Sequence, residues 1–311
     1  MRTVYFDPSL LTSTFCPRAM FYRQVENTQT KFDSIAAIYG NSGHRFLRKL
    51  YEGEGFNPAL AYASEYYQEN TEGKILDAKE FRTCQHLQLV CLNYYQNHLS
   101  KYLHQMPVKI GEGEKRILGT ELNFALPYKV TDDLQVILCG TIDKVVKKAD
   151  RQLEIIDYKF TATWDSRMYL QKAAHIPQLR FYSMMLKKFL GLSYYPSSRL
   201  EGIFLSRLQK KDPKLEKICY VEQSDSSIYL EEDMKIFEEM LHRTMAKWIG
   251  YLDHQDVGNR QSWPMDWMQC SGYWGDCSYM DLCNADRDQG LYELLKTKFE
   301  EEPYEPLKFQ N

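Results

Sequence analysis

The chain has 311 residues and a formal net charge of −3, and 44% of its residues are hydrophobic and 26% charged. These proportions are ordinary for a globular protein and exclude a disordered or low-complexity chain. No stretch approaches the roughly 20 apolar residues that a membrane helix needs. The N-terminal residues lack the apolar run of a secretory signal, so we expect an intracellular, cytoplasmic protein without a membrane partner.

Apolar periodicity predicts helices first, then mainly strands. The first expected helices cover residues 9–25, 33–51, 57–70 and 78–106. Three strands, a helix, two strands and a helix follow at 115–128, 135–148, 152–160, 178–190, 199–208, 215–223 and 233–254. An irregular segment and a last helix end the series at 263–283 and near residue 299. This order predicts an α/β (α+β) fold with a mixed central sheet flanked by helices.

The same order suggests three parts of the chain. Residues 1–110 form an N-terminal helical region, residues 111–230 hold most strands and form the core, and residues 231–311 hold a helix and a cysteine-rich segment. A chain of this length exceeds the usual single domain, which agrees with an elaborated core.

Two acids and a lysine fall on neighbouring expected strands. Asp143 ends the sequence Gly-Thr-Ile-Asp, and Asp157 and Lys159 lie two apart in Ile-Ile-Asp-Tyr-Lys. Side chains i and i+2 share a face of a strand, and Asp143 can join that face from the adjacent strand. Converging carboxylates suit Mg²⁺ or Mn²⁺, which keep further coordination positions for water and phosphate. A surface Asp-x-Lys pair is common, but an acid on an apolar strand is costly unless it is paired or metal-bound.

Together with a later Gln-x-x-x-Tyr, these residues resemble the pattern of RecB-like nucleases of the PD-(D/E)XK superfamily. Gln178 and Tyr182 supply the last part, one helical turn apart. The resemblance implies a restriction-endonuclease-like core in which Asp143, Asp157 and Lys159 are catalytic and Gln178 and Tyr182 bind substrate. Phe160 departs from the pattern, since many relatives have threonine directly after the lysine.

The resemblance implies further residues of the site. Gly40-Asn41-Ser42-Gly43-His44 is similar to the helix histidine that binds metal in relatives with clustered cysteines, although a lone helix histidine is usually structural. Glu121 stands where the family often has a supporting catalytic acid. The implied metal ligands are His44, Asp143, Asp157 and the Tyr158 carbonyl. An imidazole among oxygen ligands makes Mn²⁺ at least as suitable as Mg²⁺.

Eight cysteines are expected to be reduced in an intracellular protein. One early and three late cysteines resemble the iron–sulfur staple of the AddB nuclease domain and of CRISPR-associated relatives, and they imply a structural [4Fe–4S] cluster. These are Cys16, Cys270, Cys277 and Cys283. Their late spacing, C-x6-C-x5-C, is wider than the C-x2-C-x5-C of relatives, so ordinary thiols and Zn²⁺ stay as alternatives. The remaining cysteines are expected in the core: Cys84, Cys91, Cys139 and Cys219.

Basic residues give two candidate tracks for the phosphate backbone, because nucleic-acid binding needs local positive charge. One spans residues 199–217 and includes Arg207, Lys210 and Lys211; the other spans residues 44–49. Each taken alone is typical of a solvated surface.

The resemblance implies a metal-dependent nuclease that hydrolyses phosphodiester bonds in DNA. We favour an exonuclease on single-stranded DNA or DNA ends, in recombination, repair or CRISPR-type processing. The alternatives are a non-catalytic nucleic-acid-binding or scaffold member of the fold and a sequence-specific endonuclease. The chain lacks a Gly-x4-Gly-Lys-Ser/Thr motif, so a helicase or recombination protein would be a partner.

Overall fold

The computed structural model describes residues 2–8, 16–30, 34–74, 80, 82–99, 106–110, 117–130, 134–163, 167, 170–171, 177–206, 219–253, 256–266, 270–272, 275–285 and 287–302. Backbone contacts divide the chain into two units. The terminal unit comprises residues 1–32, 124–140 and 230–311, and the central unit comprises residues 33–123 and 141–229. Both units are discontinuous in sequence, so they cut across the three parts expected from sequence order.

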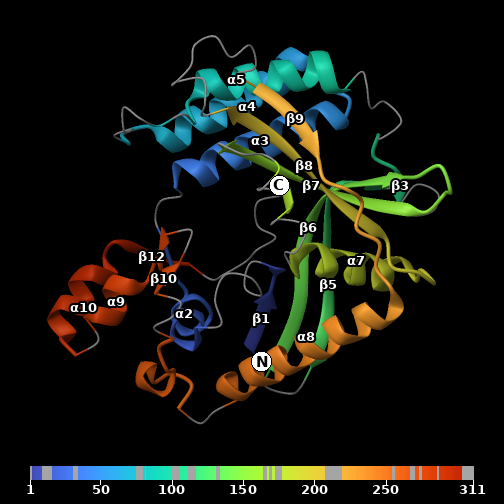
Figure 1. The fold of residues 1–311 in the computed structure, drawn as a ribbon. Coiled ribbons are helices and arrows are strands. Elements are labelled where there is room, and N and C mark those ends of the chain that lie inside the picture. Colours follow the sequence, from blue (N-terminus) through green and yellow to red (C-terminus); the bar gives the residue numbers. More distant parts are fainter. Residues whose placement is uncertain are drawn as a thin grey trace. The chain divides into compact units, whose positions relative to one another are not determined.

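A mixed sheet holds the strands in the order β1-β6-β7-β8-β9, and β5 also pairs with β6 (Figure 1). β7 and β8 run parallel, as do β1 and β6, whereas β6–β7 and β8–β9 are antiparallel. The strands are β1 (Arg2–Phe6), β5 (Thr120–Val130), β6 (Leu134–Lys147), β7 (Leu153–Thr163), β8 (Ser197–Ser206) and β9 (Cys219–Gln223). The predicted mixed sheet flanked by helices is confirmed.

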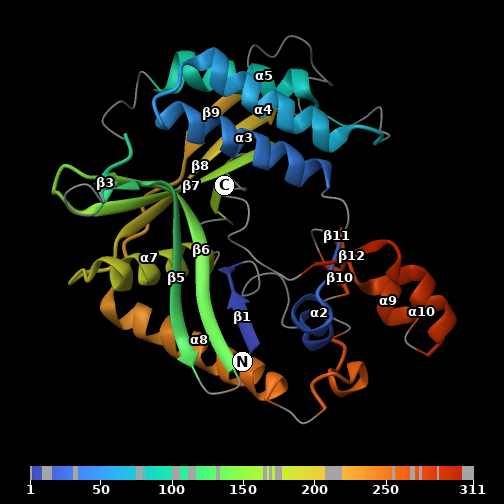
Figure 2. The ribbon, with the colours of Figure 1, turned by 180° about the vertical axis from the view of Figure 1, so that it is seen from behind.

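In the central unit, three helices cover one face of β7–β9, as the two opposite views agree (Figures 1 and 2). They are α3 (Ile35–Tyr51), α4 (Phe56–Thr71) and α5 (Cys84–Asn93), and the π-helical segment η2 (Tyr94–Leu99) continues α5. Ser34 caps α3 by accepting the Ala37 amide, which fixes where the helix begins. Ile156 and Tyr158 of β7 enter the core that these helices form.

The opposite face of β7 and β8 is covered by α7 (Pro177–Leu190), whose Leu179 packs with Leu200 and Phe204 of β8. Leu200 is the register partner of Asp157, so the Asp157 side of β7 faces α7. A short hairpin, β3 (Lys109–Ile110) and β4 (Ile117–Leu118), completes the described elements of this unit.

The terminal unit brings residues from both ends of the chain together. β2 (Thr28–Thr30) pairs with β12 (Phe299–Glu301), and the Trp263 ring packs on Phe21 and stacks on Tyr251. Its helices are α2 (Pro17–Met20), the π-helical η1 (Phe21–Val25), α8 (Glu231–Leu252), the 3₁₀ helix η6 (Arg260–Ser262), α9 (Met280–Asn284) and α10 (Gln289–Lys296). A small hairpin joins β10 (Ser271–Gly272) to β11 (Gly275–Asp276).

Some predicted boundaries were wrong. The long helix expected over 78–106 begins only at Cys84, because Thr83 is extended and caps it by accepting the His86 amide. Strands β1, β2 and β12 were not predicted, and Phe299 lies in β12 rather than in the last helix. Residues 9–15 of the first expected helix lie outside the described residues. None of the described helices has the length and apolar character needed to cross a membrane.

Helix α3 comes closest to β7 at Gly43. A Cβ atom added there would lie 2.4 Å from the Cγ atom of the Phe160 ring. Phe160 stands where many of the nucleases that the sequence resembles have threonine, and its ring lies where Gly43 has no side chain.

Gly43→Ala is therefore expected to destabilise the protein by about 1–3 kcal/mol, the usual cost of overpacking a core. Phe160→Thr removes the ring, so the added methyl should cost much less in that background. Chemical unfolding of the two single variants and the double variant measures the coupling. Additive changes in the free energy of unfolding would show that the Phe160 ring is not the cause of the destabilisation by Gly43→Ala.

Candidate metal centre

The two aspartates lie where β6 and β7 stop pairing. The antiparallel register runs from Lys147↔Leu153 to Lys144↔Ile156, and the next positions are Asp143 and Asp157. Beyond this point the Tyr158 amide donates to Oδ2 of Asp143 at 2.6 Å instead of to a strand carbonyl. The end of the pairing thus fixes the Asp143 carboxylate against β7.

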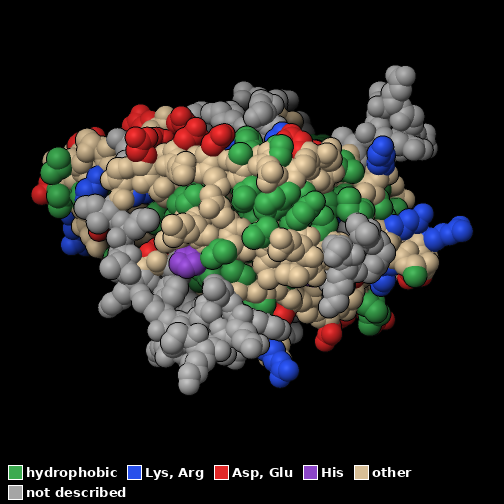
Figure 3. Space-filling view, turned by 90° about the horizontal axis from the view of Figure 1, so that it is seen from above, with side chains coloured by type: hydrophobic (Ala, Val, Ile, Leu, Met, Phe, Trp, Pro, Cys, Tyr) green, Lys and Arg blue, Asp and Glu red, His purple; other side chains and the backbone are tan. Residues whose placement is uncertain are grey.

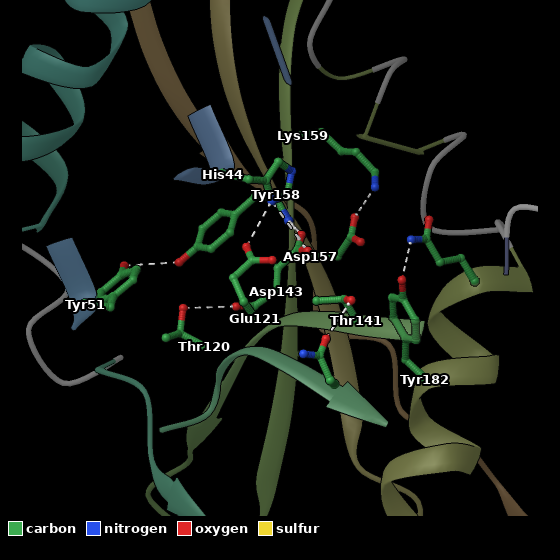
Figure 4. Close-up of polar contacts among 12 residues, drawn as sticks. His44, Tyr51, Thr120, Glu121, Thr141, Asp143, Asp157, Tyr158, Lys159 and Tyr182 are labelled. Atoms are coloured by element: carbon green, nitrogen blue, oxygen red, sulfur yellow. Dashed lines mark hydrogen bonds and ion pairs between the residues drawn. The ribbon is translucent and has the colours of Figure 1, made fainter. Parts of the chain in front are cut away.

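His44, Glu121 and Asp143 converge from α3, β5 and β6 (Figure 4). Nδ1 of His44 lies 3.4 Å from Oε1 of Glu121 and 3.5 Å from Oδ1 of Asp143. One ligand atom from each residue lies within 4.8 Å of the other two. Among the described residues this is the one group of three or more histidine, cysteine or acidic side chains packed so closely.

Glu121 has a φ of +46°, in the left-handed region that residues other than glycine rarely adopt. Such backbone costs of order 1–3 kcal/mol and persists where its surroundings enforce it, often at functional sites. In this strained backbone conformation the Glu121 carboxylate lies against the His44 ring.

Asp157 and Lys159 form a pair beside this group. Nζ of Lys159 lies 2.6 Å from Oδ2 of Asp157, and Asp157 is only 1% exposed. Its Oδ1 atom is buried without a hydrogen-bond partner among the described residues. A buried, unsatisfied carboxylate oxygen is costly, and a cation is one way to satisfy it.

The pKa values of these groups follow from burial and mutual charge. Burial raises the pKa of Asp143, although the charges of His44 and Lys159 oppose it. Burial likewise raises the pKa of Asp157 to about 6 against the charge of Lys159. Burial alone would lower the pKa of His44, but Asp143 and Glu121 raise it to about 9. Without metal, a proton on His44 therefore neutralises part of a negative site.

The donor set fits a hard or borderline divalent cation, because it offers carboxylate oxygens and one imidazole nitrogen. The residues that lie closest together are not the same four that the resemblance implied as metal ligands. Glu121 lies within the close group, while the Asp157 carboxylate contacts Lys159. The Tyr158 ring points toward Tyr51, away from Lys159 (Figure 4).

Gln178 and Tyr182 lie on α7, where Nε2 of Gln178 donates to the Tyr182 hydroxyl at 3.0 Å. Figure 4 shows Tyr182 on the Lys159 side of the centre, opposite Tyr51. The two motif residues thus form one unit on the helix that covers the Asp157 face of the sheet.

The candidate basic tracks are less informative. Arg207, Lys210 and Lys211 lie outside the described residues. Arg48 pairs with Glu52 at 2.8 Å, and Lys49 pairs with Glu54 at 2.8 Å, so acids offset much of the second track. On the face drawn in Figure 3, hydrophobic side chains gather near the centre and the coloured Lys and Arg side chains lie mostly toward the edges.

The four cysteines of the expected staple all belong to the terminal unit. Burial raises the pKa values of Cys270 and Cys277, and the charge of the Cys16 thiol adds to both shifts. Cys16 and Cys277 act in the same direction on Cys283, whose pKa is raised chiefly by burial to about 11. The Sγ atom of Cys16 lies 3.5 Å from the Asp266 amide nitrogen, and that of Cys270 lies 3.7 Å from the Asp266 carbonyl oxygen. No three of the four cysteines have sulfur atoms within 4.8 Å among the described residues.

Two features near the centre go beyond the sequence prediction. Glu121 was expected as a supporting catalytic acid on the family resemblance, but nothing local in the sequence signals its convergence with a histidine 77 positions earlier. Sequence reasoning also passed over Lys144 and Glu201, which are buried behind the centre although both are charged. A buried position for either could be inferred only from the alternation of β6 and β8.

The fold and this centre define a protein in which acids and a lysine of a mixed sheet meet a histidine of α3 in an arrangement suited to a divalent cation. The chain belongs to the PD-(D/E)XK nuclease superfamily, whose family model matches residues 9–284. No curated protein matches the chain. The crystal structure of SSO0001 is similar at 13% identity over 71% of this chain and 76% of that one, with a TM-score of 0.25, which is too low to support an argument.

Proposed function

We propose that this protein is a divalent-metal-dependent nuclease that hydrolyses phosphodiester bonds in DNA. The observation that carries the proposal is the convergence of His44, Glu121 and Asp143 beside the buried pair of Asp157 and Lys159. Membership of a nuclease superfamily supports the reaction class.

In this proposal the residues of the centre have different roles, which follow from the chemistry of their side chains. His44, Glu121 and Asp143 would hold the cation, with Asp157 and the Tyr158 carbonyl as further candidate ligands. A bound divalent cation supplies Lewis acidity and lowers the pKa of water. Lys159, 25% exposed at its side chain, can orient the attacking water or offset charge on the phosphate.

We propose an exonuclease of the RecB-like branch that acts on single-stranded DNA or DNA ends, in recombination, repair or CRISPR-type processing. Gln178 and Tyr182 support this choice over a sequence-specific endonuclease, because they complete the RecB-like motif on α7. In this proposal they contact the substrate, Arg207, Lys210 and Lys211 contact phosphates, and a helicase or recombination protein is the partner.

The test is cleavage of end-labelled linear DNA and circular DNA, each single- or double-stranded, with Mn²⁺, Mg²⁺ or a chelator. We expect nucleotides to be released from linear DNA, none from circles, and no cleavage with chelator. Cuts at fixed positions in circles would favour the endonuclease. DNA binding without cleavage under any metal would favour the non-catalytic alternative.

His44→Ala is expected to raise the Mn²⁺ concentration for half-maximal cleavage by about 10-fold or more, a change at least as large as losing an outer-shell partner. The Mg²⁺ requirement should change less, since Mn²⁺ binds nitrogen more readily. Metal titrations of cleavage measure both. His86→Ala is the matched control, because His86 contacts Thr83 on α5 rather than the centre. An unchanged ratio of Mn²⁺ to Mg²⁺ requirements would remove His44 from the ligand set.

We also propose that Cys16, Cys270, Cys277 and Cys283 bind a structural [4Fe–4S] cluster. The contacts of the Cys16 and Cys270 sulfurs with the amide and carbonyl of the same residue, Asp266, support it. Tetrahedral Zn²⁺, with Zn–S bonds of about 2.3 Å, needs sulfurs within about 4 Å of one another. A cluster spaces its ligands more widely, because each thiolate binds a different iron.

A further inference from the structure

A buried polar network lies next to the candidate metal centre, on the face of the sheet that α3, α4 and α5 cover. Nζ of Lys144 donates to the Tyr51 hydroxyl at 3.1 Å and lies 4.9 Å from the ring centroids of both Tyr51 and Tyr158. The Tyr158 hydroxyl also donates to that of Tyr51, at 3.1 Å. Lys144 is 2% exposed and Tyr158 1% exposed, so water plays little part in satisfying these groups.

The network ends on a buried acid. The Tyr51 and Tyr94 hydroxyls lie 2.7 Å apart, and that of Tyr94 donates to Oε1 of Glu201 at 3.1 Å. Nε2 of His98 lies 3.3 Å from the other Glu201 oxygen. Tyr94 and His98 share one side of η2, a π-helical segment of a type often found at functional sites.

Charge balance explains how Glu201 stays ionised at 0% exposure. Burial opposes ionisation, but the adjacent His98 imidazole and the charge of Lys144 outweigh it and lower the pKa of Glu201 to about 2. Lys144 and Glu201 are thus opposite charges linked through two tyrosine hydroxyls. Removing one alone would leave the other uncompensated in the core.

The network contacts three of the elements that carry the metal centre, α3, β6 and β7, and on β6 and β7 its residue is the direct neighbour of a functional residue. Lys144 follows Asp143 on β6, and Tyr158 stands between Asp157 and Lys159 on β7. Tyr51 lies two helical turns after His44 on α3. The Tyr158 amide also donates to Asp143. A shift of any of these three anchors would therefore move a candidate ligand.

We propose that Lys144 and Tyr51 are positioning residues of the metal centre, because with Tyr158 they tie α3, β6 and β7 together beside their ligands. The inference rests on the proposed metal-dependent function, but it concerns ligand geometry and not the identity of the substrate. Outer-shell partners that orient metal ligands commonly change affinity 10- to 100-fold when lost.

The test is calorimetric titration of the full-length protein with Mn²⁺ alone, accompanied by DNA cleavage kinetics at saturating Mn²⁺. Tyr51→Phe, which keeps both buried charges, should raise the Kd for Mn²⁺ by about 10-fold, and the double variant Lys144→Met, Glu201→Gln by about 10- to 100-fold. KM for DNA should stay constant. Tyr67→Phe is the matched control, since this buried hydroxyl donates to the Arg82 carbonyl in the same core but away from the centre.

A purely structural network would lower stability without changing the Kd of folded protein. Wild-type Mn²⁺ affinity in Tyr51→Phe and in the folded double variant would overturn the proposal, as would an equal change in Tyr67→Phe. Wild-type protein that binds no Mn²⁺ would overturn the metal centre and this inference together. Network-dependent Mn²⁺ binding without DNA cleavage would overturn only the nuclease assignment.

Discussion

Asp157→Asn is expected to abolish DNA cleavage and, without metal, to make the protein more stable at neutral pH. The loss of cleavage should be about 10³-fold or more, equivalent to roughly 4 kcal/mol of transition-state stabilisation. It follows from the position of Asp157 beside Lys159 at the end of the β6–β7 pairing. A structural carboxylate at this place would leave cleavage unchanged.

The gain in stability follows from the sign of the pKa shift. Burial raises the pKa of Asp157 from 3.8 to about 6, against the charge of Lys159, so between these values the folded protein holds a proton that the unfolded chain has lost. Stability of the metal-free protein therefore falls as pH rises from about 4 to 6. At pH 7 the cost is on the order of 2–3 kcal/mol, a net figure that already includes the attraction of Lys159, and asparagine removes this cost.

Thermal unfolding in chelator, at pH 4 and at pH 7.5, measures this cost. Asp157→Asn should unfold at a higher temperature than the wild type at pH 7.5, and the difference should shrink at pH 4. Asp225→Asn, at an exposed position, is the matched control and should behave as the wild type. A lower melting temperature for Asp157→Asn at pH 7.5 would show that the carboxylate stabilises the apo fold.

The parts of the fold that sequence predicts well are those set by local periodicity. Strands β6 and β7 lie within three residues of their expected bounds, because alternation of apolar side chains repeats every two residues. The same alternation placed Asp157 and Lys159 on one face, and they form an ion pair. The helix expected over 33–51 begins within two residues of α3, whereas its cap, Ser34, is seen only in the structure.

The parts that sequence missed depend on contacts across long stretches of chain. β1 pairs in parallel with β6, which lies more than 130 residues later. The five residues of β1 are too few to show an alternation from which a strand could be predicted. The Glu121 carboxylate reaches His44 through a positive φ, which no propensity for glutamate predicts. The two discontinuous units likewise arise from pairing between distant segments.

Cys16→Ser is expected to remove a bound iron–sulfur cluster and to lower stability by about 3–5 kcal/mol, the chain-entropy value for losing a cross-link over a long loop. The Asp266 amide lies 3.5 Å from the Cys16 sulfur, although the two residues are 250 positions apart. The Cys277 amide donates to the Cys270 carbonyl at 2.9 Å, so these two cysteines lie opposite each other beside the β10–β11 pair. A cluster here would connect α2 to the segment around α9.

Protein purified without oxygen should be brown and contain iron and inorganic sulfide in equal amounts, four of each per chain. Replacing Cys16, Cys270, Cys277 or Cys283 by serine should bleach it and lower its unfolding temperature. Cys84→Ser is the matched control, since Cys84 packs beside the core of α3–α5 in the central unit. Zinc in place of iron would support the tetrahedral alternative. Metal-free, colourless protein from anaerobic preparation, with unchanged stability in all four variants, would leave ordinary thiols, and the nuclease proposal would stand because its residues belong to the central unit.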